Sequence, residues 1–354
     1  MLTTKKIIWK LKIFMKKKLS KILKKYQPFI VSEIGINHCG SLKLAKQIVN
    51  KIYDAGGRIV KSQFHILDEE MSDEAKKIKP SNANISIYKV IQNNKLSIED
   101  EIKLKKYIEK KKMLYICTPF SLKAAYILNK LKVKVFKIGS GEFNNLPLIN
   151  EICKFKVPMI LSTGMNDLKS IKKTVDFLKK RNADFALLHC ISEYPAEYKR
   201  LKLGFINVLK KKFPDKIIGY SDHSESIVPC ISAISKGAEI IEKHFTFSKK
   251  MAGPDISCSM DSHELKKLVE YSKIIIASQG SEKKISKIEK ITAKFAFSSV
   301  VATKSIKKNE KLTKNNIWVK RPGTGHFKAE DYFKILGKTS KENIKKGSQL
   351  KFHE

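Results

Sequence analysis

Eight short apolar segments recur along the chain, and most of them end in polar or ionisable residues. They occupy residues 29–35, 58–64, 113–120, 135–140, 159–164, 185–190, 217–223 and 239–245. Each is rich in Ile, Val, Leu and Phe, as expected for strands that are buried on both faces. Segments with helical character, such as residues 166–182 and 225–236, separate them. Eight strands alternating with helices predict an α/β fold, a (β/α)8 or TIM barrel.

The predicted fold also predicts where functional residues gather. The carboxyl ends of barrel strands open on one mouth, where the active sites of this fold lie. Side chains at the ends of the segments should therefore face one pocket: Glu33, Lys61, Gln63, Thr118, Lys137, Ser140, Ser162, His189, Asp222, His223 and His244. This convergence of ionisable and hydroxyl groups indicates an enzyme.

Two histidines end neighbouring predicted strands, His223 in the seventh segment and His244 in the eighth. Neutral imidazoles in this arrangement bind a divalent cation and leave positions open for substrate. The alternative interpretation is that both histidines are structural. Glu33 and Asp255 are carboxylates that would orient a metal-bound water or a substrate hydroxyl.

A second group combines lysines with hydroxyl side chains, and comprises Lys61, Lys137, Thr118, Ser140 and Ser162. A small ligand with a phosphate and a carboxylate needs several cations and hydroxyl or amide donors in one closed space. The segments KIGSGE (137–142) and STGM (162–165) place flexible backbone N–H donors beside these hydroxyls. The group predicts a pocket for a small anionic ligand.

The 354-residue chain is longer than a minimal barrel, and its two ends differ from its centre. Residues 28–280 are expected to form the barrel, and the charged residues 281–292 a linker. Short strand-like pieces with Gly and Asn turns in residues 293–354 predict a small, mostly β module, which would be marginal unless docked. The loop at 318–327 carries Arg321, either as a solvated turn residue or as a cation directed at an active site.

Residues 1–27 form a basic leader in which apolar positions recur at helical spacing, namely Ile8, Leu11, Met15, Leu19 and Ile22. The segment is either dispensable or an amphipathic helix on an anionic membrane. Lysines interrupt its apolar positions, which disfavours a signal peptide.

The formal net charge of +38 is dispersed over the whole chain, and no nucleic-acid-binding motif accompanies it. Such composition is typical of an AT-rich genome, and no nucleic acid partner is expected. The six cysteines contain no CxxC pair, and no run of eighteen apolar residues indicates a membrane span. These features favour a reduced, cytoplasmic protein.

Motifs that occur in order over residues 28–354 carry a family resemblance. They include SEIGINHCGS (32–41), VKSQF (60–64), CTPF (117–120), KIGSGEFNNLPLI (137–149), ILSTGM (160–165), IIGYSDH (217–223), EKHFT (242–246), GPDISCSM (253–260) and WVKRPG (318–323). The chain resembles the sialic acid synthase family, most closely its bacterial N-acetylneuraminate synthases. The last module resembles the antifreeze-like (SAF-type) domain of that family.

The resemblance implies a metal-dependent condensation of phosphoenolpyruvate with N-acetylmannosamine, with C–O cleavage releasing phosphate. It assigns a divalent cation, typically Mn²⁺, to His223 and His244. It assigns phosphoenolpyruvate to Lys61, Thr118, Lys137, Ser140, Ser162 and Ser221, sugar contacts to Gln63, Ser192, Tyr194 and Arg321, and catalytic roles to Glu33, Glu142 and Asp255. Glu142 is the candidate proton shuttle. The resemblance further implies a domain-swapped homodimer in which Arg321 reaches the sugar in the partner's barrel.

Two departures from the family pattern leave the identity of the sugar open. Ser192 stands where similar bacterial enzymes have Asn, and Ser62 and Phe64 replace more polar neighbours of Gln63. A 6-deoxy diacetamido sugar, which would give legionaminic or pseudaminic acid, is therefore an alternative substrate. Two other functional classes compete with the synthase: a degenerate barrel acting as a scaffold, which would need broken catalytic positions, and a metal-free aldolase with a Schiff-base lysine.

Overall fold

The computed structural model describes residues 17–80 and 83–351, and the chain divides into two compact units between Gln279 and Gly280. In the first unit, eight of the described strands form a closed barrel in sequence order. They are β1 (Ile30–Glu33), β2 (Ile59–Phe64), β3 (Leu114–Pro119), β4 (Phe136–Ile138), β5 (Met159–Ser162), β6 (Phe185–Cys190), β7 (Ile217–Asp222) and β8 (Ile241–His244). All neighbours are parallel, and β8 pairs with β1 to close the barrel. The predicted (β/α)8 fold is confirmed.

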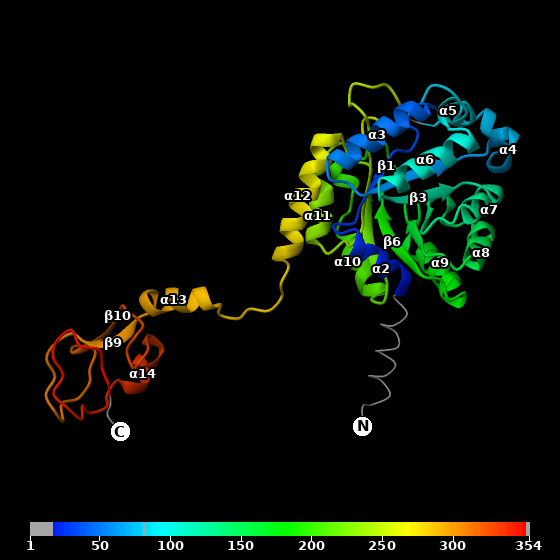
Figure 1. Ribbon diagram of the computed structural model, residues 1–354. Coiled ribbons are helices and arrows are strands. Elements are labelled where there is room, and N and C mark those ends of the chain that lie inside the picture. The colour runs from blue at the N-terminus through cyan, green and yellow to red at the C-terminus, as the bar shows by residue number, and fades with distance from the viewer. Residues whose placement is uncertain (1–16, 81–82, 352–354) are drawn as a thin grey trace. The chain divides into compact units, whose positions relative to one another are not determined.

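Helices follow the strands and surround the barrel (Figure 1). They are α3 (Leu42–Asp54), α6 (Ile98–Lys110), α7 (Leu122–Lys130), α8 (Leu146–Lys154), α9 (Leu168–Lys180), α10 (Phe205–Lys212), α11 (Val228–Ser235) and α12 (Ser262–Ser278). The described residues of the excursion after β2 form short helices, which are α4 (Leu67–Glu70), η1 (Asp73–Lys76) and α5 (Ile87–Asn94). Side-chain caps fix several starts; Ser41, for example, accepts from the Leu44 N–H at the start of α3.

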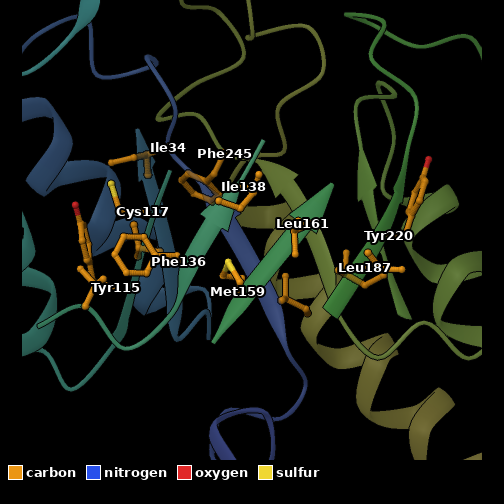
Figure 2. Close-up of a cluster of buried hydrophobic side chains, with 14 of the residues drawn as sticks. Ile34, Tyr115, Cys117, Phe136, Ile138, Met159, Leu161, Leu187, Tyr220 and Phe245 are labelled. Atoms are coloured by element: carbon orange, nitrogen blue, oxygen red, sulfur yellow. The ribbon is translucent and has the colours of Figure 1, made fainter. Parts of the chain in front are cut away.

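The exterior of the strands packs against these helices in one apolar layer. Figure 2 shows part of this layer, which includes Tyr115, Phe136, Met159, Leu161 and Leu187. Because the interior is also filled, each strand is buried on both faces. This double burial explains why the strands read as continuous apolar runs in the sequence.

The interior of the barrel changes from apolar to polar along the strands. Side chains point inward at every second residue, so Ile59 lies on the apolar floor and Lys61 stands one layer nearer the mouth. The same step leads from Ile240 to Glu242 and then His244. The floor cluster also contains Val31, Leu114, Ile116, Val135, Ile160, Ala186, Leu188 and Ile217. An apolar floor therefore supports a polar layer at the mouth.

Helix α2 (Lys17–Lys25) covers this floor. Leu19 and Leu23 are 0 % and 4 % exposed and belong to the floor cluster. The Leu19 N–H also donates to the Asp184 carboxylate at 3.0 Å. The apolar side chains of the floor need a cover that excludes water, and α2 provides it. The part of the expected leader that forms α2 therefore belongs to the barrel and is neither dispensable nor bound to a membrane. Residues 1–16 of that leader lie outside the described residues.

We predict that Leu19→Ala lowers the free energy of unfolding by about 2–4 kcal/mol, because it opens a cavity in a closed apolar floor. Urea denaturation measures the change. Leu122→Ala is the matched control, since Leu122 is 47 % exposed on α7 and should lose less than about 1 kcal/mol. Equal losses in the two variants would contradict the packing of α2 on the barrel.

Glu101 on α6 is a buried carboxyl group, 3 % exposed, that accepts hydrogen bonds from Tyr115, at 2.6 Å, and from Ser62. Burial raises the pKa of Glu101 from 4.5 to about 7. The folded state therefore holds this proton more tightly than the unfolded state. The resulting stabilisation is complete below pH 4.5 and is lost as the pH rises through about 7.

We predict that Glu101→Gln removes this part of the pH dependence. Between about pH 4.5 and pH 7 the wild-type chain should lose about 3 kcal/mol that the variant does not lose. Urea denaturation of both chains at several pH values in this window measures it. Parallel stability curves for the two chains would show that the carboxyl group does not titrate in this range.

The second unit contains α13 (Lys287–Ala296), β9 (Ser299–Ala302), β10 (Ile317–Lys320), η4 (Ala329–Asp331) and α14 (Tyr332–Ile335). The strands β9 and β10 are antiparallel, and a small core includes Val300, Leu312 and Ile317. The Gly323 N–H donates to the Lys294 carbonyl at 2.9 Å, which joins α13 to this unit. The helix thus runs past residue 292, where the linker was expected to end.

Two further observations concern the whole of the described chain. None of its helices combines the length and the apolar character that a membrane crossing requires. All six cysteines are free thiols, and five of them are buried.

Candidate active site

A cavity of about 330 Å³ opens at the carboxyl ends of the barrel strands. It brings together most of the residues expected at the site: Glu33, Lys61, Gln63, Thr118, Lys137, Ser140, Ser162, Ser192, Tyr194, Ser221, His223, His244 and Asp255. Apolar side chains from the excursion after β2, among them Ile87, Val90 and Ile91, complete one wall. The excursion therefore shapes the cavity, as expected of a long loop at a barrel mouth.

Two residues expected at the pocket face the other way. His189 lies within 2.7 Å of the Leu201 carbonyl and stacks on Tyr220, and Asp222 pairs with Lys243. The placement of both residues in the pocket was wrong. Inward and outward positions alternate along a strand, and the neighbouring Cys190 and Ser221 take the inward positions.

Glu142 was also expected at the site but does not line this cavity. It lies in a neighbouring pocket with Glu70 and Asn145, and Asn145 donates to its carboxylate at 2.6 Å. Burial raises the pKa of Glu142. Arg321 directly follows β10 and belongs to the second compact unit.

Charged side chains form a compact cluster inside the cavity. Lys61 Nζ lies 2.7 Å from Glu33 Oε2 and 3.3 Å from Glu242 Oε1. Lys137 Nζ lies 3.0 Å from the same Glu242 oxygen and donates to Ser162 Oγ at 2.8 Å. Two ammonium groups thus share one carboxylate oxygen, and hydroxyl groups surround them.

The pKa values of these groups reflect burial and neighbouring charge. Burial opposes ionisation of Glu33, but Lys61 and His244 outweigh it and hold the pKa of Glu33 well below its usual value. Burial likewise opposes ionisation of Glu242, and Lys137 and Lys61 still lower its pKa. Burial lowers the pKa of Lys137 despite the attraction of Glu242. Both carboxyl groups are therefore anionic at neutral pH.

A chain of hydrogen bonds orients Gln63. Its Nε2 donates to Glu33 Oε1 at 2.8 Å, and its Oε1 lies 3.0 Å from His65 Nε2. His65 Nδ1 in turn lies 2.9 Å from Glu70 Oε1, and the ring stacks on Phe120 with centroids 4.3 Å apart. Since the amide nitrogen must face Glu33, the amide oxygen must face His65. One N–H of the amide remains for a ligand.

The two histidines have nitrogens that could bind a cation. His223 Nδ1 lies 2.8 Å from the Ile191 carbonyl and donates to it, which leaves Nε2 for a metal. His244 Nδ1 is buried and has no hydrogen-bond partner in the described chain. The ring centroids are 5.5 Å apart. The described residues contain no converged set of three His, Cys, Asp or Glu side chains, so two imidazoles would leave the remaining positions to water and substrate.

A buried ion pair behind the cavity fixes the strands that carry these histidines. Lys243 Nζ lies 2.6 Å from Asp222 Oδ2 and also donates to the Ser224 carbonyl, and both charged side chains are 0 % exposed. Asp222 and Lys243 are paired in the register of β7 and β8 and directly precede His223 and His244. This network limits movement of the two imidazoles relative to each other.

Glu242 and Cys190 also line the cavity, although neither was among the residues expected there. Glu242 lies inside an apolar run, where one charged residue gives little signal. The alternation of strand residues was a usable signal, because Glu242 is two positions before His244 and must share its face. Cys190 has the same relation to Leu188 of the floor.

Comparison with known proteins shows which family the chain matches. Residues 48–284 match the model of the NeuB family, and residues 297–354 match the SAF domain. The chain is 36% identical over 330 residues to the N,N'-diacetyllegionaminic acid synthase of Campylobacter jejuni, and the matched region covers 91% of this chain and 98% of that one. It is 31% identical over 315 residues to the human N-acetylneuraminate-9-phosphate synthase, with 88% of each chain covered.

A solved structure is also similar. It is the N-acetylneuraminic acid (sialic acid) synthetase of Leptospira borgpetersenii in complex with citrate, with 31% identity and a TM-score of 0.68. The match covers 75% of this chain and 90% of that one.

Proposed function

The chain belongs to the NeuB family, and from this premise we propose that it condenses phosphoenolpyruvate with an N-acylated mannosamine-type sugar to form a nonulosonic acid. The observation that carries the proposal is the cluster of Lys61, Lys137 and buried hydroxyls beside two imidazoles with available nitrogens. Phosphoenolpyruvate needs the first group, and an aldehyde acceptor uses the second. The acceptor proposed first is N-acetylmannosamine, which would give N-acetylneuraminate.

In this proposal the lysines and hydroxyls bind phosphoenolpyruvate. Lys61 and Lys137 each form charge-assisted hydrogen bonds to its phosphate or carboxylate, worth about 1.5–3 kcal/mol apiece. Thr118 Oγ1 is buried without a partner in the described chain, so a ligand that reaches it would satisfy this hydroxyl. Ser140, Ser162 and Ser221 also line the cavity and would contact phosphoenolpyruvate, and Ser162, which accepts from Lys137, keeps its own O–H for the ligand.

The sugar would lie in the same cavity, beside the phosphoenolpyruvate. Glu33, Gln63, Tyr194 and Asp255 line the cavity and would present acceptors and donors to the hydroxyl groups of the sugar. A divalent cation such as Mn²⁺, held by His223 and His244, would act as a Lewis acid toward the aldehyde oxygen of the open-chain sugar.

The residues then guide the bond changes. Carbon C3 of phosphoenolpyruvate attacks the aldehyde carbon, water adds at C2, and phosphate leaves by C–O cleavage. Glu33 is ionised and held by Lys61 and Gln63, so it would orient the attacking water or a sugar hydroxyl by accepting a hydrogen bond from it. Glu142, in the neighbouring pocket, would need to reach the cavity to act as the proton shuttle.

The sugar contact by Arg321 belongs to the same proposal. In a domain-swapped homodimer, the guanidinium from one chain would donate to the N-acyl carbonyl of the sugar in the other chain's barrel. Arg suits this position because its planar fork donates in a fixed geometry and keeps its charge.

A 6-deoxy diacetamido sugar is the second candidate acceptor, with legionaminic or pseudaminic acid as the product. Two observations favour it: the 36% identity to the diacetyllegionaminic acid synthase and the small side chain of Ser192 in the cavity wall.

One experiment tests the reaction and the acceptor together. Purified protein with Mn²⁺ and phosphoenolpyruvate is incubated separately with N-acetylmannosamine and with two 6-deoxy diacetamido sugars, the one that would give legionaminic acid and the one that would give pseudaminic acid. We expect one acceptor to give a nine-carbon acid of the matching mass with equimolar phosphate release. Phosphate without a nonulosonic acid, or no product from any of the three sugars, would contradict the proposal.

A further inference from the structure

We propose that Glu242 makes the anion pocket selective for a phosphate group that carries a proton over a fully ionised anion of the same shape, such as sulfate. The inference deepens the proposed function and rests on it only in taking this cavity as the phosphate site. Glu242 is 2 % exposed and lines the cavity.

The two oxygens of this carboxylate have unequal surroundings. Oε1 accepts from Ser221 Oγ at 3.0 Å and lies within 3.3 Å of the ammonium groups of both Lys61 and Lys137. Oε2 is buried and has no hydrogen-bond partner in the described chain. A buried acceptor without a partner is costly, and a ligand that brings an O–H removes the cost. Hydrogen phosphate has such an O–H, whereas sulfate at neutral pH has none.

Two N–H groups near Glu242 are free to bind an anion. Each ammonium group has three N–H donors. Lys61 contacts Glu33 and Glu242, and Lys137 contacts Ser162 and Glu242, so one donor of each lysine remains. These two donors can bind two oxygens of a tetrahedral anion while the third ligand oxygen meets Glu242.

The charges explain why the protonated anion is preferred. The two lysines are balanced by the two carboxylates of Glu33 and Glu242, so the cluster has no excess positive charge to attract every anion. An unprotonated oxygen placed against Glu242 meets a like charge, which weakens the binding of the anion. A protonated oxygen converts the same contact into a charge-assisted hydrogen bond.

The test compares inorganic phosphate with sulfate by titration calorimetry at about pH 8, where phosphate is mainly a dianion that retains one proton. The two probes then match in charge and shape. We expect the wild-type protein to bind phosphate at least roughly tenfold more tightly than sulfate. The amide in Glu242→Gln keeps the shape of the side chain and removes its charge. Sulfate should therefore bind to this variant at least roughly tenfold more tightly than to the wild-type protein, and the variant should no longer prefer phosphate over sulfate.

Two variants serve as controls. Glu101→Gln changes a buried carboxyl group outside the cavity and should keep the preference, whereas Lys137→Ala should weaken the binding of both anions. Equal binding of the two anions by the wild-type protein, binding of neither, or an unchanged preference in Glu242→Gln would each overturn the proposal. The first two outcomes need no variant, so a folding defect in Glu242→Gln cannot hide the answer.

The measurement is independent of the sugar reaction. A chain that makes a nonulosonic acid but binds sulfate as well as phosphate would refute only the role of Glu242. A chain that prefers phosphate but makes no product from any sugar would refute the proposed reaction and leave the selectivity intact.

Discussion

His223→Ala and His244→Ala are each expected to remove bound Mn²⁺ and to lower kcat by more than roughly a hundredfold. The reason is the small number of ligands: the described residues offer no converged third protein ligand, so one remaining imidazole cannot retain the ion. Equilibrium dialysis with Mn²⁺ measures the affinity without any need for activity, and a coupled phosphate assay measures kcat.

His263→Ala provides the matched control, because His263 is exposed at the start of α12 and should leave both measurements unchanged. A chelator should abolish wild-type activity, and added Mn²⁺ should restore it. Full activity in excess chelator, or wild-type Mn²⁺ affinity in both alanine variants, would rule out the assignment of the cation to these histidines.

Arg321→Ala is expected to be nearly inactive alone and to recover activity when mixed with His223→Ala. If each barrel receives Arg321 from its partner, the mixed dimer contains one site with both residues intact and one site lacking both. Random exchange makes half of the dimers mixed, so activity should return to about a quarter of the wild-type value. Activity is followed after subunit exchange has been verified by mass-labelled chains.

The control for complementation is a mixture of His223→Ala with His244→Ala. Both histidines belong to the same barrel, so no arrangement of the second unit creates an intact site, and activity should stay absent. Verified mixed dimers of Arg321→Ala and His223→Ala that remain inactive would show that Arg321 acts within its own chain or not at all.

The fold could be predicted because strand burial on both faces leaves a strong pattern in the sequence. Each of the eight apolar segments contains one barrel strand, and the bounds of β6 are the same as those of the predicted segment, residues 185–190. The grouping of site residues followed from topology, since parallel strands bring Lys61 and His244 to one mouth although they are far apart in the chain.

The facing of individual side chains was harder to predict. The ends of the strands are polar on both faces here. The sequence alone therefore did not distinguish His189 and Asp222 from inward-facing residues, because the alternation assigns a direction only when one residue of the strand is already known to face inward. Glu142 depends on the path of the short helix η2 (Ser140–Glu142), which no periodicity reports. The tertiary partner of α2 was equally hidden, because an amphipathic helix shows its apolar face but not what covers it.

The packing of α2 has a practical consequence for anyone who produces this protein. A shortened chain that starts at Pro28, the first residue of the expected barrel, would keep every cavity residue of the first unit and still expose a ring of apolar side chains at the opposite end. Such exposed patches favour aggregation. Expression vectors should therefore retain the chain from Lys17 onward. Any purification tag should be placed upstream of Lys17 with a flexible spacer, so that the tag does not disturb the packing of Leu19 against the barrel floor.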